Sequence, residues 1–141
     1  MHITLEADYA VRIVDRLASQ EGRLDAKSIA ADTGVTPRFT LKILRKLAAS
    51  GLVRSYQGAK GGYELARSAG EITLREVIET VEGVYALSRC VSPEHICRCD
   101  AQHCRRCDCR FQRVYDEISE MVRQKLSKVT FGGPMGKEDV E

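Results

Sequence analysis

The sequence predicts a mainly α-helical protein with one small β-hairpin and a long helix near its C-terminal end. Three observations support this fold class. Apolar residues recur at helical spacing in five segments. Capping residues and glycines mark the ends of these segments. Two short β-like runs flank one glycine-rich tip. A chain of 141 residues is long enough for one domain with a core of its own.

The composition is that of an ordinary globular protein, with 43% hydrophobic and 30% charged residues. No apolar run approaches the roughly 18–20 residues of a membrane span. The first residues are acidic and lack the basic start of a signal peptide. We therefore expect a cytoplasmic protein with no membrane partner. There, clustered cysteines are more often metal ligands or redox-active groups than a disulfide framework.

The first helix is predicted from about Glu6 to Ser19, and Gly22 stops it. Its apolar face consists of Ala7, Ala10, Val11, Ile13, Val14 and Leu17.

Two further helices that meet at a tight glycine turn predict a helix-turn-helix. Asp25 caps the first of them and Gly34 ends it in a left-handed conformation. Thr36 caps the second, with Pro37 at its first position, and Gly51 ends it. The side chains expected in the core are Ile29, Ala30, Phe39, Leu41, Ile43, Leu44 and Leu47.

A β-hairpin is predicted directly after these helices. The runs Leu52–Tyr56 and Tyr63–Ala66 flank the tip Gly58–Gly62. A hairpin in this position is the wing of a winged helix-turn-helix. Lys60 on the flexible tip suits contact with phosphate or with the DNA minor groove.

The helix after the wing has clear start and stop signals. Thr73 and Glu76 form a capping box, Ile72 and Val77 form a hydrophobic staple, and Gly83 stops the helix. Val77, Ile78 and Val81 are expected to face the core.

A long helix is predicted for residues 111–131, with one continuous apolar stripe and charges on its other face. Such a helix at the end of a small domain usually packs against a partner helix, so we expect a homodimer; packing against its own domain is the alternative. The stripe consists of Phe111, Val114, Tyr115, Ile118, Met121, Val122, Leu126 and Val129.

The net charge is only +2, but basic residues are concentrated in one region. From Thr36 to Arg67 seven basic residues stand against one acidic residue, Glu64. This excess indicates phosphate contacts, and an ordinary solvated surface is the alternative interpretation. The seven are Arg38, Lys42, Arg45, Lys46, Arg54, Lys60 and Arg67.

All six cysteines lie within residues 90–109, a stretch with almost no apolar periodicity, which we interpret as a metal-binding loop. On residue chemistry alone, a four-thiolate zinc site that includes Cys104 and Cys107 stays open, as does thiol redox chemistry without metal. His95 and His103 are expected to be solvated loop residues. The cysteines are Cys90, Cys97, Cys99, Cys104, Cys107 and Cys109.

Four stretches resemble the Rrf2 family of winged-helix transcription regulators: LEADYAVRIV, VTPRFTLKILRKLAASGLV, QGAKGGYELAR and ITLREVIETVEG. The resemblance covers about residues 1 to 130. It implies a homodimer that binds a partly palindromic operator in double-stranded DNA with one recognition helix and one wing from each protomer. We do not expect an enzyme, because the sequence has no Ser/His/Asp order, phosphate loop, paired catalytic carboxylates or nucleotide fingerprint.

The family's recognition helix corresponds to Thr36–Leu47. Arg38 is expected to read a base, because arginine is the commonest specific reader of guanine and the helix N-terminus usually enters the major groove. Lys42 and Arg45 are expected to contact phosphate, and the wing tip the minor groove. The residues expected to contact DNA are Thr36, Pro37, Arg38, Thr40, Lys42, Arg45, Lys60, Gly61 and Gly62, with Thr40 among the exposed polar positions.

Iron–sulfur members of the family carry three spaced cysteines, and Cys90, Cys97 and Cys104 fit this pattern as C-x6-C-x6-C. Two-iron members have a fourth ligand, a histidine, where this chain has Cys107. Four-iron members use an aspartate of the partner subunit where this chain has Asp8. We favour Cys107, because a thiolate is a soft ligand from the same loop.

Cys99 and Cys109 depart from the family pattern and are possible substitute ligands or redox-active thiols. The expected cofactor is thus a 2Fe-2S or 4Fe-4S cluster, with zinc as the alternative.

The expected organisation is a winged helix-turn-helix domain (1–83), a cysteine-rich cluster-binding loop (84–110), a dimerisation helix (111–131) and a disordered tail (132–141). The functional hypothesis is a dimeric DNA-binding transcription regulator that senses redox, nitric oxide or iron status through the cluster. The alternative is a winged-helix regulator with structural zinc, or with a thiol-redox or metabolite switch.

Overall fold

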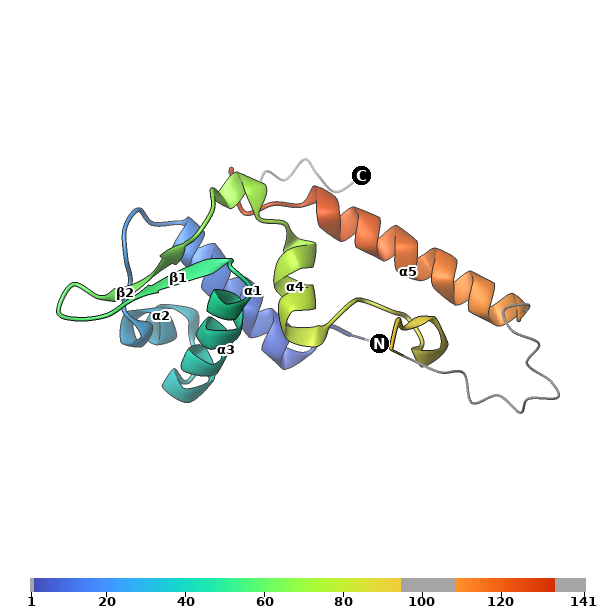
Figure 1. Cartoon of the computed structure of the whole chain (residues 1–141), viewed down its shortest axis with the longest axis horizontal. Coiled ribbons are helices and arrows are strands. Elements are labelled where there is room, and N and C mark those ends of the chain that lie inside the picture. Colours follow the sequence, from blue (N-terminus) through green and yellow to red (C-terminus); the bar gives the residue numbers. More distant parts are fainter. Residues whose placement is uncertain (1, 95–108, 134–141) are drawn as a thin grey trace.

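The helix-turn-helix and the wing form as the sequence predicts. The structure is a computed structural model that describes residues 2–94 and 109–133. Figure 1 shows α1 to α4 and the hairpin gathered together, with α5 running away from them. The elements in chain order are α1 (Leu5–Ala18), α2 (Ala26–Thr33), α3 (Pro37–Ala49), β1 (Val53–Tyr56), β2 (Gly62–Leu65), the 3-10 helix η1 (Ala69–Glu71), α4 (Leu74–Glu82), the 3-10 helix η2 (Arg89–Val91) and α5 (Arg110–Lys128).

The predicted caps at the helix-turn-helix are confirmed. Asp25 Oδ1 accepts a hydrogen bond from the Ser28 N–H at 2.6 Å, and Thr36 Oγ1 accepts one from the Phe39 N–H at 3.4 Å. Gly34 ends α2 at a φ of 70°, in the left-handed region that favours glycine. The turn between α2 and α3 therefore follows from local chemistry.

The start of α4 carries both bonds of the predicted capping box. The Glu76 N–H donates to Thr73 Oγ1 at 3.2 Å, and the Thr73 N–H donates to Glu76 Oε2 at 2.9 Å. Ile72 and Val77 are both buried, as expected for a staple, and Gly83 caps the C-terminal end.

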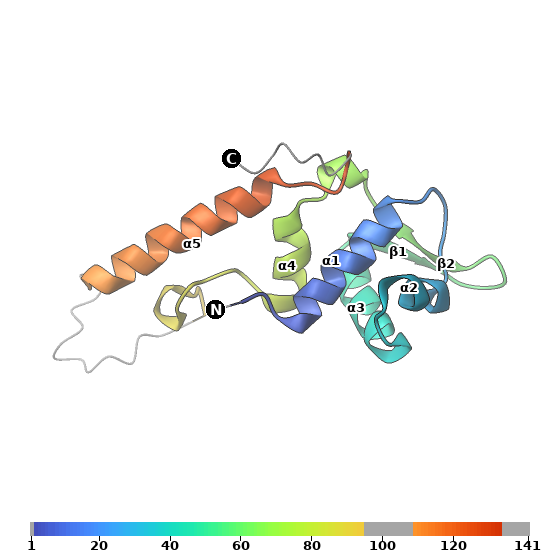
Figure 2. The same cartoon turned by 180° about the vertical axis from the view of Figure 1, so that it is seen from behind.

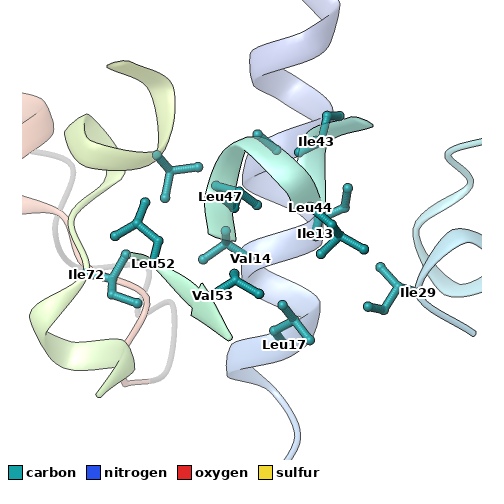
Figure 3. Packing of buried hydrophobic residues seen from close by; sticks show 12 residues of the cluster. Ile13, Val14, Leu17, Ile29, Ile43, Leu44, Leu47, Leu52, Val53 and Ile72 are labelled. Carbon is teal, nitrogen blue, oxygen red and sulfur yellow. The ribbon is translucent and has the colours of Figure 1, made fainter. Parts of the chain in front are cut away.

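One apolar core joins the four helices to the start of the hairpin, as Figure 3 shows. The spacing of its α3 members places them on a single face of that helix. The buried side chains of this core are Ala10, Ile13, Val14, Leu17, Ile29, Ile43, Leu44, Leu47, Leu52, Val53, Ile72 and Val77.

The inner face of α3 differs from the predicted one. Phe39 and Leu41 were expected in the core but are 43% and 36% exposed, so this prediction is wrong. Thr40 was expected among the exposed polar positions but is fully buried. The packing of α3 against α1 buries the face of α3 that includes Thr40. The Phe39 ring lies at the edge of this buried face and meets the Tyr9 ring edge-on, with centroids 6.0 Å apart.

The wing is an antiparallel hairpin in which Val53 pairs with Leu65 and Tyr56 with Gly62. β1 begins at Val53, one residue later than predicted, and β2 covers Gly62–Leu65, one residue earlier at both ends than the predicted Tyr63–Ala66. A third segment joins the hairpin, because Leu24, between α1 and α2, forms a bridge with Tyr63. Figure 2 shows this connection descending beside β2.

The long helix α5 ends at Lys128, three residues before the predicted end. The residues after it return to the winged domain. The Leu74 N–H donates to the Val129 carbonyl at 2.8 Å, and the Phe131 N–H donates to the carbonyls of Ala69 and Ile72 at 3.1 and 3.2 Å. These bonds fix the C-terminal end of α5 next to the start of α4.

The apolar stripe of α5 is divided between two faces, contrary to the single stripe that was predicted. Tyr115, Val122 and Leu126 are half-buried, and α5 packs against α4. The second face remains exposed and consists of Phe111, Val114, Ile118 and Met121.

In the part of the chain that the structure describes, no helix is long and apolar enough to cross a membrane. Of the predicted disordered tail, residues 134–141 lie outside the described residues. The division of the chain into four segments stays a prediction.

We expect the substitution Thr40→Val to raise the free energy of unfolding by up to about 1 kcal/mol, measured by urea denaturation. Thr40 Oγ1 is buried and has no hydrogen-bond partner among residues 2–94 and 109–133. The substitution replaces this hydroxyl by a methyl group of similar size. The matched control is Thr33→Val, because Thr33 Oγ1 donates to the Ile29 carbonyl at 2.7 Å. Equal losses of stability in both variants would contradict the prediction.

Candidate nucleic-acid interface and cysteine segment

The outer face of α3 carries three exposed cations, Arg38, Lys42 and Arg45. Their spacing of four and three residues places them on one face of the helix, away from the buried stripe. Thr36 and Pro37 are exposed at the N-terminal end of α3, and their contact with DNA stays a prediction. Thr40 is not part of this surface, because the core encloses it.

One carboxylate of α1 neutralises part of this charge. Glu6 Oε1 lies 2.6 Å from Lys46 Nζ and 3.5 Å from Lys42 Nζ. The hydrogen bond from Lys46 holds the pKa of Glu6 below its ordinary value, with a smaller contribution from Lys42. Arg38 and Arg45 make no ion pair within the described residues. They are therefore the uncompensated cations of this face.

Lys60 lies in the wing tip, where the close backbone packing requires glycine at the two following positions. A Cβ on Gly61 would lie 2.5 Å from the Tyr56 carbonyl oxygen, and one on Gly62 would lie 2.7 Å from the Leu24 carbonyl oxygen. Both distances are too short for a side chain, so the two glycines are required for the close packing of the tip. The Lys60 side chain is exposed.

The cations of α3 and the wing tip belong to the same end of the molecule. In Figures 1 and 2 the hairpin, α2 and α3 lie at one end, and the N-terminal end of α5 lies at the other. The two elements that carry the predicted DNA-contact residues, α3 and the hairpin, thus lie at the same end of the molecule.

The first cysteine of the segment is held against α5. Cys90 is half-buried in η2, its Sγ donates to Ser88 Oγ at 3.3 Å, and its carbonyl oxygen accepts from Gln112 Nε2 at 3.0 Å. Cys109 is exposed directly before α5. Both ends of the cysteine segment are therefore brought to the N-terminal end of α5. Cys97, Cys99, Cys104 and Cys107, together with His95 and His103, lie outside the described residues.

Two more bonds fasten the segment before η2 to α5. The Leu87 N–H donates to Ser119 Oγ at 2.8 Å, and Arg123 Nη1 donates to the Tyr85 carbonyl at 2.7 Å. Ser119 is fully buried. With the Gln112 bond, these contacts form three attachments spread along α5.

The donor set fits a soft metal or an iron–sulfur cluster. Six thiols within twenty residues are the ligands that zinc and iron–sulfur clusters prefer. Within the described ranges, no three His, Cys, Asp or Glu side chains are grouped to hold a metal ion. Asp8, the alternative fourth ligand, instead forms an ion pair with Arg12 at 2.8 Å. The ligand set stays a prediction.

Sequence reasoning missed Glu6, Arg23 and Ser119. Glu6 and Arg23 make contacts with residues 36 to 40 positions away, so no local pattern signals them. Ser119 had a weak signal, because it is a small polar residue between the apolar positions Tyr115 and Val122.

Comparisons with known proteins agree with this architecture. The family model Rrf2, described as an iron-dependent transcriptional regulator, matches residues 3–133. A Mycobacterium tuberculosis protein named as an HTH-type transcriptional regulator, Rv1287, is 38% identical over 91 residues, which are 63% of this chain and 56% of that protein. The chain thus spans little more than half the length of this relative.

A second relative and a solved structure cover more of the chain. The HTH-type transcriptional regulator IscR of Serratia proteamaculans is 28% identical over 142 residues, 99% of this chain and 82% of that protein. The structure of CymR, described as the global cysteine regulator of B. subtilis, superposes with a TM-score of 0.70 at 25% identity and covers 93% of each chain. These relatives are named as regulators, in agreement with the expectation that the chain is not an enzyme. Because the family model matches nearly the whole chain, this chain belongs to the Rrf2 family of transcriptional regulators.

Proposed function

We propose that this chain is a homodimeric transcription regulator that binds double-stranded DNA and senses redox, nitric oxide or iron status through a cysteine-ligated iron–sulfur cluster. The observation that carries the proposal is the exposure of Arg38, Arg45 and Lys60, without compensating acidic groups among the described residues, at one end of the molecule. The cysteine segment is attached at the opposite end, to the start of α5.

The α3 surface suits a DNA duplex. An α-helix with an exposed outer face fits the major groove, and Arg38 in the first turn of α3 would contact a base edge there. Arg45 lies two turns further along α3 and would contact the phosphate backbone. The hairpin that carries Lys60 lies at the same end of the molecule as α3, and Lys60 would contact the backbone or the minor groove. Lys42 forms an ion pair with Glu6, so it contributes less net positive charge to this surface than Arg38 or Arg45.

The exposed face of α5 suits a second copy of the chain. Phe111, Val114, Ile118 and Met121 are 55%, 49%, 38% and 64% exposed. Their spacing of three, four and three residues is that of a coiled-coil seam. Large apolar side chains in a row on one helix are costly in water and mark an interface. Two such faces, one from each protomer, would cover each other.

The sensing part of the proposal rests on the chemistry of the cysteine segment and on its attachments. Cys90, Cys97, Cys104 and Cys107 would hold the cluster, which supplies reversible redox and ligand-exchange chemistry when it is bound. Two side chains of α5 bond to the backbone in and before η2: Gln112 to the Cys90 carbonyl and Ser119 to the Leu87 N–H. A shift of Cys90 would therefore change the position of α5 and of the dimer seam on it.

A second candidate is a regulator of the same fold with structural zinc or a thiol or metabolite switch. The structural similarity to CymR favours it, because that protein is described as a cysteine regulator. The surplus thiols Cys99 and Cys109 have a role in this candidate as redox partners.

We expect Arg38→Ala to relax base preference, and Lys60→Ala to weaken binding evenly over all sequences and to lower the salt slope by about one unit. The measurement uses a duplex selected from a random-sequence pool by the wild-type protein, with affinities taken at several salt concentrations. Lys128→Ala, which removes an exposed cation at the C-terminal end of α5, outside α3 and the wing, is the control and should change neither quantity. Identical behaviour of Arg38→Ala and Lys60→Ala would contradict the separate roles.

We expect Met121→Glu and Ile118→Glu to convert a dimer into a monomer in sedimentation equilibrium, because each places a charge in an apolar seam. Gln124→Glu, an exposed position of α5 outside the seam, should leave the dimer intact. A wild-type protein that sediments as a monomer would contradict the proposed seam.

We expect protein purified without oxygen to be coloured and to contain iron and sulfide in equal amounts. Cys107→Ala should lose this iron, whereas Asp8→Ala and Cys109→Ala should retain it. A colourless protein with stoichiometric zinc would contradict the cluster and favour the second candidate. Loss of iron in Asp8→Ala alone would make Asp8, not Cys107, the fourth ligand.

A further inference from the structure

The connection between α1 and α2 braces the wing. Leu24 pairs with Tyr63 through two backbone bonds: the Leu24 N–H donates to the Tyr63 carbonyl at 3.0 Å, and the Tyr63 N–H donates to the Leu24 carbonyl at 2.8 Å. Gly62 allows this contact, because a Cβ there would collide with the Leu24 carbonyl at 2.7 Å. The tip-proximal part of β2 is thereby attached to a segment some forty residues earlier in the chain.

Arg23 extends this attachment to the wing tip. Its guanidinium carbon lies 3.4 Å from the centroid of the Tyr56 ring, and its Nη1 donates to the carbonyl oxygen of Lys60 at 3.2 Å. Tyr56 is itself held, because its hydroxyl donates to Glu64 Oε1 at 2.6 Å. One arginine thus bonds to the backbone of the residue whose side chain is exposed at the tip.

A glycine-rich tip would otherwise bind DNA at an entropic cost. Ordering a flexible backbone costs conformational entropy, and glycine loses more freedom than other residues. A tip that is already ordered in the free protein avoids most of this cost when it binds. The planar guanidinium suits the task, because it stacks on an aromatic ring and donates a hydrogen bond at the same time.

We propose that Arg23 is a positioning residue for the wing, which fixes the direction in which Lys60 approaches nucleic acid. The proposal rests on the proposed DNA binding, and it assigns Arg23 no contact with DNA. If Arg23 instead contacted phosphate directly, it would act through its charge, and a lysine at this position would preserve its function.

The first test measures the free protein. Backbone order parameters of the Gly58, Ala59 and Lys60 amides are determined by NMR relaxation in wild type, Arg23→Ala, Arg23→Lys and the control Arg54→Ala. Arg54 lies exposed on β1 and makes no ion pair within the described residues. Both Arg23 variants should lower the order parameters from about 0.85 towards 0.6, and Arg54→Ala should not. Unchanged order in Arg23→Ala overturns the proposal.

The second test measures affinity for the duplex selected by the wild-type protein. Arg23→Ala and Arg23→Lys should each weaken binding by about fivefold, with the base preference unchanged. In the Lys60→Ala background the same substitutions should cost less than about twofold, because residues that act through one another are not additive. Wild-type affinity in Arg23→Lys, or full additivity with Lys60→Ala, overturns the proposal. If the wild-type protein binds no DNA, the proposed function fails, and the NMR result alone decides whether Arg23 orders the wing.

Discussion

The packing of α3 against α1 determines what the outer surface of the winged domain presents. Burial of Ile43, Leu44 and Leu47 fixes the rotation of α3 about its own axis, and this rotation turns Arg38 and Arg45 outwards. Burying one such side chain contributes roughly 1.5–3 kcal/mol, more than an exposed ion pair contributes. The apolar face therefore determines the orientation of α3, and this orientation determines which way its cations point. The buried hydroxyl of Thr40, which has no hydrogen-bond partner within the described part of the chain, agrees with this order of importance.

Local chemistry made most of the fold predictable, and contacts between distant segments account for the rest. The caps at Asp25 and Thr36 and the capping box at Thr73 depend on residues within one helical turn, and all are confirmed. The orientation of Phe39 depends on Tyr9 of another helix, and the division of the α5 stripe depends on α4, so the spacing of apolar residues alone did not fix them. The basic surface was predictable as a charge excess, but the partial neutralisation by Glu6 was not, because Glu6 lies forty residues before Lys46.

The connections of α5 link the proposed sensing segment to the winged domain. Its N-terminal end holds the backbone beside Cys90 through Gln112, and its C-terminal end is followed by residues that pair with the start of α4. A helix fixed at both ends acts as a rigid link between them. The wing has a corresponding support in Arg23 and Leu24, which belong to the winged domain itself. The proposed sensing segment and the proposed DNA-contact surface thus lie on separate parts of the molecule, which α4 and its neighbouring residues connect.

The central claim is that the state of the cysteine segment controls DNA affinity, and one measurement tests it most directly. Anaerobically purified protein is titrated with its selected duplex before and after a chelator removes the bound iron, at constant salt and with dimerisation checked in both states. We expect removal of the iron to change the affinity by at least about tenfold, within the range of coupling between distinct sites. Equal affinities, with complete loss of iron and an intact fold, would contradict it.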